Sequence, residues 1–333
     1  MRSRTCAMSS SRIRPATGHL LAVHLPSPRR RSPSGWHRYR AGMPFLVVGE
    51  SLVDLIGVPP TAVPGGSPLN VAVGLAAAGH RVRLASELGD DRFGRLVRGH
   101  LAGHGVDLAD LTTAAATNLA VARPDPDRGT VDYEFRLAWR WAGQPSLAGV
   151  DCLHMGSLGA VLEPGATAVR ATVAAARAAG VPVSYDPNVR PALLDRDPDA
   201  PARIEALVAA ADLVKVSSDD LAWLYPGTGD RAAAERWTGR GRRLVVVTRG
   251  DRGAVAFQGG YAVECRAPAV SVVDPVGAGD AFTAGLLSSL VRAGALPAPG
   301  RDALTRALRH AVEVAAAACT HRGATPPPDP GLS

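Results

Sequence analysis

From Pro44 onward the sequence alternates short apolar runs with stretches of helical spacing, and this alternation constrains the fold more than any other feature. Apolar runs of four or five residues that end at Gly, Asp or Ser are typical of buried strands. Strands that alternate with helices predict an α/β fold, in which a mainly parallel central sheet is covered by helices on both faces. Ligands bind such sheets beyond the carboxyl ends of the strands, so we expect the functional side chains there.

The elements follow from these patterns. The predicted strands of the sheet are Phe45–Val48, Arg81–Ala85, Cys152–Met155, Val181–Tyr185, Leu213–Val216 and Leu244–Thr248. The predicted helices are Leu69–Ala78, Phe93–Gly103, Ala166–Ala179, Ala281–Ala293 and Ala303–Cys319. Two hairpins are predicted, one over residues 254–265 around two glycines and one over residues 117–137 around Pro124–Asp127. The second hairpin lacks helical partners, so we expect a small separate lid.

Composition and cysteine usage exclude several classes of protein. The 333 residues are 46% hydrophobic and 20% charged, which is ordinary for a globular chain. No run of 18 apolar residues exists, so no membrane-spanning helix is expected. The four cysteines are far apart in the sequence, which predicts neither a zinc site nor a disulfide framework and favours a reducing cytoplasm.

The formal net charge of +7 is concentrated at the N-terminus. Residues 1–42 hold nine arginines and no acid, and the rest of the chain has 28 basic and 30 acidic residues. The body is therefore not expected to bind nucleic acid or another polyanion. The basic segment is rich in Ser and Pro and is predicted to be disordered. A transit peptide, a weak nucleic-acid-binding tail and a mis-assigned start before Met43 are all compatible with it. The last is favoured, because arginines outnumber lysines by 36 to one, as in a GC-rich genome where spurious upstream starts are easily assigned.

The most informative stretch is Val273–Gly285, where a strand end leads through a glycine-rich turn into a helix. The small residues Gly277, Ala278 and Gly279 allow successive backbone N–H groups to point into one concavity. The first turn of the helix adds free N–H donors and a partial positive charge. Together these groups predict an anion site suited to a phosphate or a transferring phosphoryl group.

An acid, Asp280, follows this predicted anion site directly. Its charge would repel a phosphate that was merely bound, but it suits a base that takes a proton from a hydroxyl attacking the γ-phosphate. The alternative is a helix N-cap, a position that Asp favours. No GxxxxGK[ST] loop, complete dinucleotide fingerprint or Gly-x-Ser-x-Gly elbow is present, so the corresponding nucleotide-binding and hydrolase classes are not predicted.

Two motifs resemble those of the ribokinase-like (PfkB) carbohydrate kinases. Asp274–Asp280 is similar to the C-terminal signature of that family, and Pro64–Ala72 is similar to its N-terminal Gly-Gly segment. Gly49-Glu50 with Asp54, and Asp186–Pro191, resemble fructokinases most. The resemblance covers the body of the chain, and it implies a ribokinase-like three-layer sandwich over residues 43–328, with lid strands around 56–64 and 117–137 and a tail at 329–333.

The resemblance also implies an activity. It predicts an ATP-dependent sugar kinase that uses Mg²⁺, with K⁺ as a further cofactor and a homodimer through the lid. In the catalytic role it places Asp280 with Gly277, Ala278 and Gly279. As substrate-binding residues it implies Asp54, Gly65, Gly66, Asn70 and Arg190. As nucleotide-binding residues it implies Lys215, Thr248, Gly250, Gly253, Gly277 and Gly279.

The metal sites implied by the resemblance are Asp220, as a Mg²⁺ ligand through water, and a monovalent-cation loop. The residues of that loop are Asp274, Val276, Ala318 and Gly323. The sequence departs from the family at Ser217 and Asp220, which stand where the family has Asn and Glu. The segment Tyr133–Trp141 looks like the lid-side substrate region of fructokinases, with a shortened turn before its tryptophans.

Several of these residues are also compatible with simpler structural roles. Asp54 fits a turn or helix cap, Asn70 fits a cap, and Arg190 fits a surface arginine. Ribose, 2-keto-3-deoxygluconate and nucleosides are rival acceptors to fructose, because carboxylate and amide groups suit several polyols. A non-catalytic sugar or nucleotide sensor on the same fold is the alternative from another functional class.

Overall fold

The computed structural model describes residues 44–57, 59–125, 130–238 and 243–324. The N-terminal extension at 1–42, the tip of the hairpin at 126–129, the final prolines and the tail at 329–333 lie outside the described residues. None of the described helices has the length and apolar character needed to cross a bilayer.

Nine strands of the described chain form one sheet, in the order β13-β12-β11-β10-β9-β8-β1-β4-β5. Neighbouring strands from β11 to β5 pair in parallel, whereas β12 pairs antiparallel to both β11 and β13. The mainly parallel sheet predicted from the sequence is thereby confirmed. The strands are β1 Phe45–Val48, β4 Val82–Gly89, β5 Leu111–Ala114, β8 Cys152–Gly156, β9 Val183–Asp186, β10 Leu213–Ser217, β11 Leu244–Thr248, β12 Ala254–Gln258 and β13 Tyr261–Cys265.

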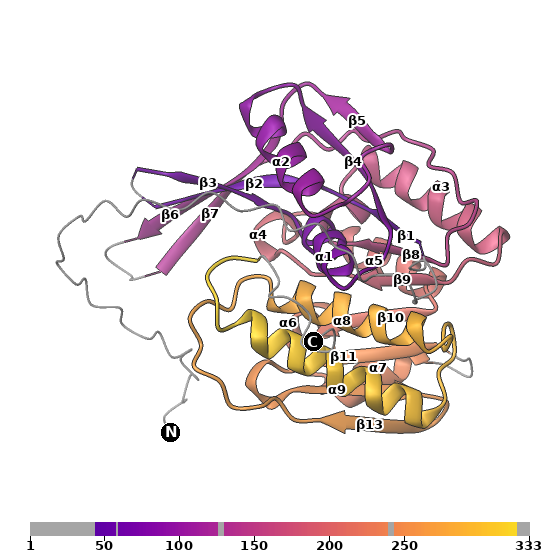
Figure 1. The fold of residues 1–333 in the computed structure, drawn as a ribbon. Helices are drawn as coiled ribbons and strands as arrows, with labels where there is room; N and C mark the ends of the chain where they lie inside the picture. The colour runs from indigo at the N-terminus through magenta and orange to yellow at the C-terminus, as the bar shows by residue number, and fades with distance from the viewer. Residues whose placement is uncertain (1–43, 58, 126–129, 239–242, 325–333) are drawn as a thin grey trace, which may run out of the picture.

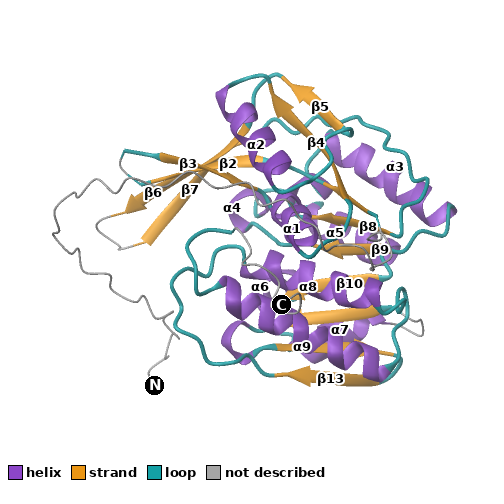
Figure 2. Cartoon of the chain, viewed as in Figure 1, coloured by secondary structure: helices purple, strands orange, loops and turns teal. Residues whose placement is uncertain are grey.

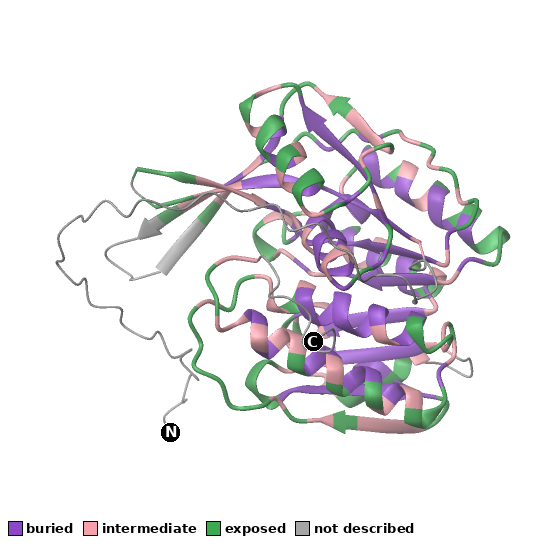
Figure 3. Ribbon diagram, viewed as in Figure 1, coloured by how far each residue is buried: buried purple, intermediate pink, exposed green. Residues whose placement is uncertain are grey.

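Helices cover both faces of this sheet and give the three layers visible in Figure 2. Side chains of β1 alternate, with Phe45 and Val47 facing one layer and Leu46 and Val48 the other. The first layer consists of α1 Ser67–Ala77, α2 Arg92–Gly103, α8 Ala278–Arg292 and α9 Arg301–Ala318. The second consists of α3 Gly165–Ala178, α5 Ala200–Ala210, α6 Ser218–Leu224 and α7 Asp230–Thr238, with the short α4 Pro191–Leu194 beside them. The central strands are buried throughout (Figure 3).

A second sheet of four described strands projects from the side of the body (Figure 1). Its order is β3-β2-β6-β7, and we call it the lid sheet. Its strands are β2 Leu52–Ile56, β3 Thr61–Gly65, β6 Asn118–Asp125 and β7 Thr130–Arg136. Only three residues separate β1 from β2, so the lid sheet begins where strand β1 of the body ends.

The lid sheet ends before the tryptophans that the sequence resemblance placed in the lid-side substrate region. Trp139 and Trp141 are buried in the core of the second helical layer, with ring centroids 6.1 Å apart. The Trp139 ring nitrogen donates to the Gly159 carbonyl at 2.9 Å. These side chains therefore anchor the return of the chain from the lid sheet to the body, and only residues up to Arg136 belong to the lid sheet.

Candidate active site

The glycine-rich turn stands at the N-terminus of α8, as the sequence predicts. Gly277 is the N-cap with a φ of 81°, a left-handed conformation that favours glycine, and no side chain caps this helix. The Ala278 amide donates to the Pro275 carbonyl at 3.2 Å. No intrachain acceptor within the described residues takes the Gly279 amide, so this donor is free to meet an anion at the helix end.

Asp280 lies in the first turn of α8, and its half-buried carboxylate bonds to a different helix. Ser67 Oγ donates to Oδ1 at 2.6 Å, and Asn70 Nδ2 donates to Oδ2 at 2.8 Å. The alternative role of Asp280, a helix N-cap, is wrong, because Gly277 is the N-cap. Burial raises the pKa of Asp280 above its usual value, although the two hydrogen bonds oppose this shift.

Asp54 and the two glycines at the start of α1 come together where the lid sheet meets the body. Asp54 sits within β2, not in a turn or helix cap, and β2 pairs antiparallel with β3. A Cβ on Gly65 would lie 2.2 Å from Asp54 Oδ2, so the carboxylate lies directly over this glycine. Burial raises the pKa of Asp54 to about 6, opposed by the charge of Arg190. Gly66 is the N-cap of α1 with a φ of 105°, which excludes a capping role for Asn70.

Arg190 belongs to the same side of the site. Its Nη1 donates to the Asn188 side-chain oxygen at 2.7 Å, which holds the guanidinium against its own loop. Glu50 is also near, because the Arg190 charge acts on both Glu50 and Asp54. Burial raises the pKa of Glu50 to about 7, while its Oε2 accepts from the Gly159 amide at 2.6 Å.

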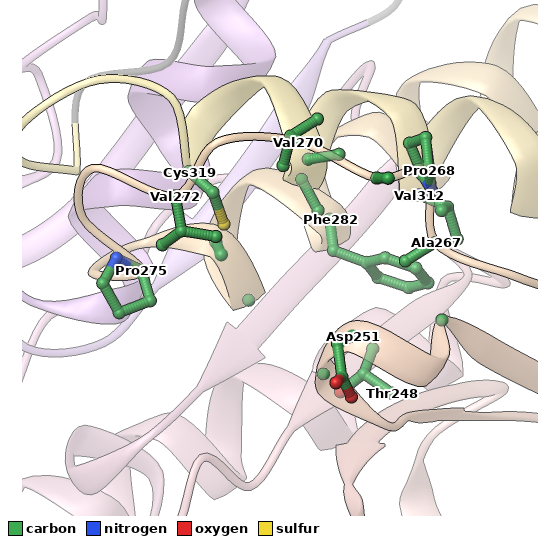
Figure 4. A pocket seen from close by; sticks show the side chains of 17 residues that line it. Thr248, Asp251, Ala267, Pro268, Val270, Val272, Pro275, Phe282, Val312 and Cys319 are labelled. Carbon is green, nitrogen blue, oxygen red and sulfur yellow. The ribbon is translucent and has the colours of Figure 1, made fainter. Parts of the chain in front are cut away.

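A cavity of about 620 Å³ opens beside the other side of the glycine-rich turn. It is lined mostly by apolar groups, and Figure 4 shows Phe282 and Cys319 on one side and Thr248 and Asp251 on the other. Of the predicted nucleotide-binding residues, the cavity lining includes Thr248, Gly250, Gly253 and Gly279. Neither Gly277 nor Lys215 is part of that lining. Lys215 instead lies inside the protein, where its Nζ is 3.0 Å from Asp186 Oδ2.

Asp220 has a structural environment. It forms a capping box with Ser217 at the start of α6, in which its Oδ2 accepts from the Ser217 amide at 3.0 Å. Its Oδ1 accepts from the Val189 amide at 2.8 Å. Both oxygens of this buried carboxylate therefore accept hydrogen bonds from backbone amides, so its contacts in the structure are structural, and its role as a Mg²⁺ ligand through water stays a prediction.

The residues of the predicted cation loop are held together by hydrogen bonds. Asp274 accepts from the Val276 amide at 3.0 Å and from the Gly323 amide at 2.9 Å. The Val273 amide donates to the carbonyl of Cys319, the residue after Ala318, at 2.8 Å. Residues 319–324 are thus fastened against the turn that precedes α8, and a Cβ on Gly277 would lie 2.5 Å from the Cβ of Ala324.

Sequence reasoning assigned no specific role to Ser67, Glu50 or Asp186, although each lies in a motif quoted above. Ser67 lay within a quoted motif, but its contact with Asp280 spans 213 residues and has no local signature. For Asp186 a signal existed, because an acid at the end of a buried strand beside a strand with the only lysine suggests an ion pair.

The comparisons with known proteins give one consistent result. The family model described as "pfkB family carbohydrate kinase" matches residues 46–330. A fructokinase from Rhizobium leguminosarum bv. trifolii is 32% identical over 262 residues, which is 74% of this chain and 79% of that protein. Fructokinase-1 from Oryza sativa subsp. japonica is 32% identical over 311 residues, covering 86% and 95% of the two chains.

Solved structures with the same architecture include fructokinases. The Xylella fastidiosa fructokinase with bound ATP has a TM-score of 0.77 and 28% identity, with 85% of this chain and 94% of that chain covered. A double mutant of the Vibrio cholerae O395 fructokinase, bound to fructose, ADP and potassium ion, has a TM-score of 0.75 and 27% identity, with 86% and 96% covered. An aminoimidazole riboside kinase from Salmonella enterica has a TM-score of 0.72 and 27% identity, with 85% and 95% covered.

Proposed function

This chain belongs to the pfkB family of carbohydrate kinases, and we propose that it transfers the γ-phosphoryl group of ATP to a hydroxyl of fructose. The observation that carries the proposal is the position of Asp280. Its carboxylate stands at the mouth of α8 beside a free backbone amide, and it is held by two side chains of the helix that follows the lid sheet. A base and an anion site are thus adjacent, as phosphoryl transfer to an alcohol requires.

In the proposed reaction the sugar lies between the lid sheet and α1. Asp54, which lies over Gly65, accepts hydrogen bonds from sugar hydroxyls. Gly66, Asn70 and Arg190 border the same space. The reacting hydroxyl faces Asp280 and forms a bond to the γ-phosphorus as the bond from that phosphorus to the leaving oxygen of ADP breaks. The hydroxyl proton passes to Asp280. The free Gly279 amide and the positive end of α8 stabilise the charge that spreads over the transferring group.

The nucleotide occupies the 620 Å³ cavity in this proposal, with its phosphates directed toward Gly279. Mg²⁺, when bound with ATP, would be held mainly by the phosphates and water and would neutralise charge on the transferring group. Asp220 contributes through water or through its hold on the Val189 loop. The cation loop of Asp274, Val276, Ala318 and Gly323 is the proposed K⁺ site, supported by the potassium ion in the Vibrio cholerae relative.

Fructose is favoured as the acceptor because this chain matches fructokinases over most of their length. The similar riboside kinase from Salmonella enterica keeps a nucleoside among the rivals, together with ribose and 2-keto-3-deoxygluconate. The three described cysteines are free, which supports a cytoplasmic location.

We also propose a homodimer through the lid sheet. Its outer strands, β3 and β7, have no further strand beside them within the described chain. Ile56 at the end of β2 and Tyr133 on β7 each expose 45% of their surface. Sedimentation of the wild type and of Ile56→Asp tests this: a dimer that the substitution converts to a monomer supports it, and a monomeric wild type rules it out.

Release of ADP over a panel of sugars, with and without K⁺, tests the proposed function, and Asp280→Asn tests the mechanism. Loss of a positioned general base costs about 10²–10⁴-fold in rate, so we expect kcat to fall in that range while ATP still binds. Asp302→Asn is the matched control, because Asp302 is also a first-turn helical acid but is not among the residues that line the nucleotide cavity. Near-normal turnover by Asp280→Asn would remove Asp280 from its role. Sugar binding without ADP release from any sugar would favour the sensor.

A further inference from the structure

The only lysine of the chain is buried in an ion pair whose contribution to stability does not account for its presence. Lys215 on β10 is 4% exposed, and its partner Asp186 on β9 is fully buried. Removing two charges from water costs several kcal/mol per ion, and well-packed apolar residues often replace such a pair without loss. The burial of this pair therefore points to a role in the reaction.

The pair lies directly beneath the glycine-rich turn. A Cβ built on Gly279 would be 3.1 Å from Lys215 Nζ, so the ammonium lies almost in contact with the first turn of α8. Thr283 of the same helix links the two, because its Oγ1 donates to the Gly279 carbonyl at 3.0 Å and lies 3.4 Å from Asp186 Oδ2. The ion pair thus forms the floor of the predicted anion site.

The charges at this floor are unusual for a site that receives a phosphate. Three carboxylates, Asp186, Asp220 and Asp280, act on Lys215 from β9, α6 and α8. Burial lowers the pKa of Lys215, but these acids more than offset it, so the lysine stays protonated. Two further titratable groups lie near it. Burial and Lys215 lower the pKa of His154 on β8 to about 3, and burial raises the pKa of Tyr185 well above its usual value, so both are neutral. Lys215 is therefore the one cation among the ionisable groups described at this floor.

We propose that Lys215 is a positioning residue for phosphoryl transfer: its ammonium offsets the three carboxylates beneath Gly279, so that the anionic γ-phosphoryl group can approach Asp280. Asp186 holds the ammonium at that place and Thr283 couples the pair to α8. This inference rests on the proposed function, and it separates Lys215 from the residues that line the nucleotide cavity. Lys215 acts on the γ-phosphoryl group, which ADP lacks. The affinity for ADP should therefore depend far less on Lys215 than the affinity for ATP.

Binding of ADP and of a non-hydrolysable ATP analogue, each with Mg²⁺, tests the proposal on the full-length protein. For Lys215→Met we expect the Kd of the analogue to rise at least about 10-fold and kcat to fall about 10²-fold, the size of effect seen when one electrostatic stabiliser of a transition state is removed. The Kd of ADP should change less than about threefold. Lys215→Arg keeps the charge and should retain most of the preference for the triphosphate.

The double variant Asp186→Asn/Lys215→Met guards against a folding defect, because it removes both charges of the buried ion pair together. We expect it to melt near the wild-type temperature and still to bind the analogue weakly. Wild-type kinetics in the double variant would mean that Lys215 only neutralises Asp186. An equal rise in the Kd of ADP and of the analogue in Lys215→Met would mean a structural role. Either result overturns the proposal. A failure of the proposed function appears separately, as a wild type that binds the analogue but phosphorylates no sugar.

Discussion

At the scale of single residues, the site combines side chains that the sequence separates by more than 200 positions. Asp280 is held by Ser67 and Asn70, 213 and 210 residues earlier. The motif around Asp280 was sufficient to predict an acid at a helix mouth, because that feature is local. Its partners could not be derived in the same way, since a serine in the first turn of a helix bonds to the helix itself as readily as to a distant carboxylate.

Gly65 should be required for the position of Asp54. In Gly65→Ala the new methyl group would overlap Asp54 Oδ2, so the carboxylate must move off the predicted sugar position. Loss of a hydrogen bond to a charged group costs about 1.5–3 kcal/mol, so we expect the KM for the sugar to rise about 10- to 100-fold with little change in the KM for ATP. Steady-state kinetics measure both. Gly99→Ala, which meets nothing within 4 Å, is the control, and an unchanged KM for the sugar in Gly65→Ala would contradict the assignment.

Glu50 should make stability depend on pH in the direction opposite to that of most carboxylates. Its pKa is raised from 4.5 to about 7 in the fold, so the folded protein binds the extra proton between these values. The contribution of Glu50 to the free energy of unfolding therefore falls as pH rises from about 4.5 to 7 and is constant above that.

Glu50→Gln removes this titration and keeps an acceptor for the Gly159 amide. Relative to the wild type, the variant should gain up to about 3 kcal/mol in free energy of unfolding across that interval. Urea unfolding at several pH values measures the difference, with Glu313→Gln at an exposed position as the control. A difference that stays constant with pH would show that Glu50 is ionised throughout.

At the scale of elements, long periodic segments and buried strands were predicted well. The helices that were missed are α4, α5, α6 and α7, and two of them, α5 and α6, show why. The α6 helix has only seven residues and depends on the Ser217–Asp220 capping box, while α5 starts among prolines and aspartates that suggest a loop. The predicted start of α8 was three residues late, because Gly279 does not favour a helix interior. In the lid sheet, β2 pairs with distant β6, a contact with no local pattern.

The nucleotide cavity should discriminate weakly between purine bases. Among the described lining residues, the polar side chains are those of Thr248, Asp251 and the thiol Cys319, and the rest are apolar or glycine. An apolar pocket rejects a similar group by only about 10- to 200-fold, whereas a site built to hydrogen-bond a substrate reaches 10⁴ or more. We expect kcat/KM for GTP and ITP to lie within about 200-fold of that for ATP. Discrimination of 10⁴ would require specific contacts to the base.

At the scale of the whole molecule, the family match and the described fold begin at nearly the same place. The family model starts at residue 46 and the first strand at Phe45. We therefore propose residues 43–328 as the kinase domain. A chain that begins at Met43 should keep the melting temperature, kcat and both KM values of the full chain. It should also bind a cation exchanger less tightly, because nine arginines are removed. A loss of activity or of folding in the shorter chain would assign residues 1–42 a part in the enzyme.

The bonds from α1 to Asp280 have a consequence for how such proteins can be recombined. A chimera with the early part of one relative and the late part of another would have a correctly oriented Asp280 carboxylate only if the donor of α1 brings a hydroxyl and an amide to the places of Ser67 and Asn70. Acceptor preference and turnover are consequently not separable traits in this architecture, and evolution toward a new sugar through changes in α1 would alter the speed of the reaction as well.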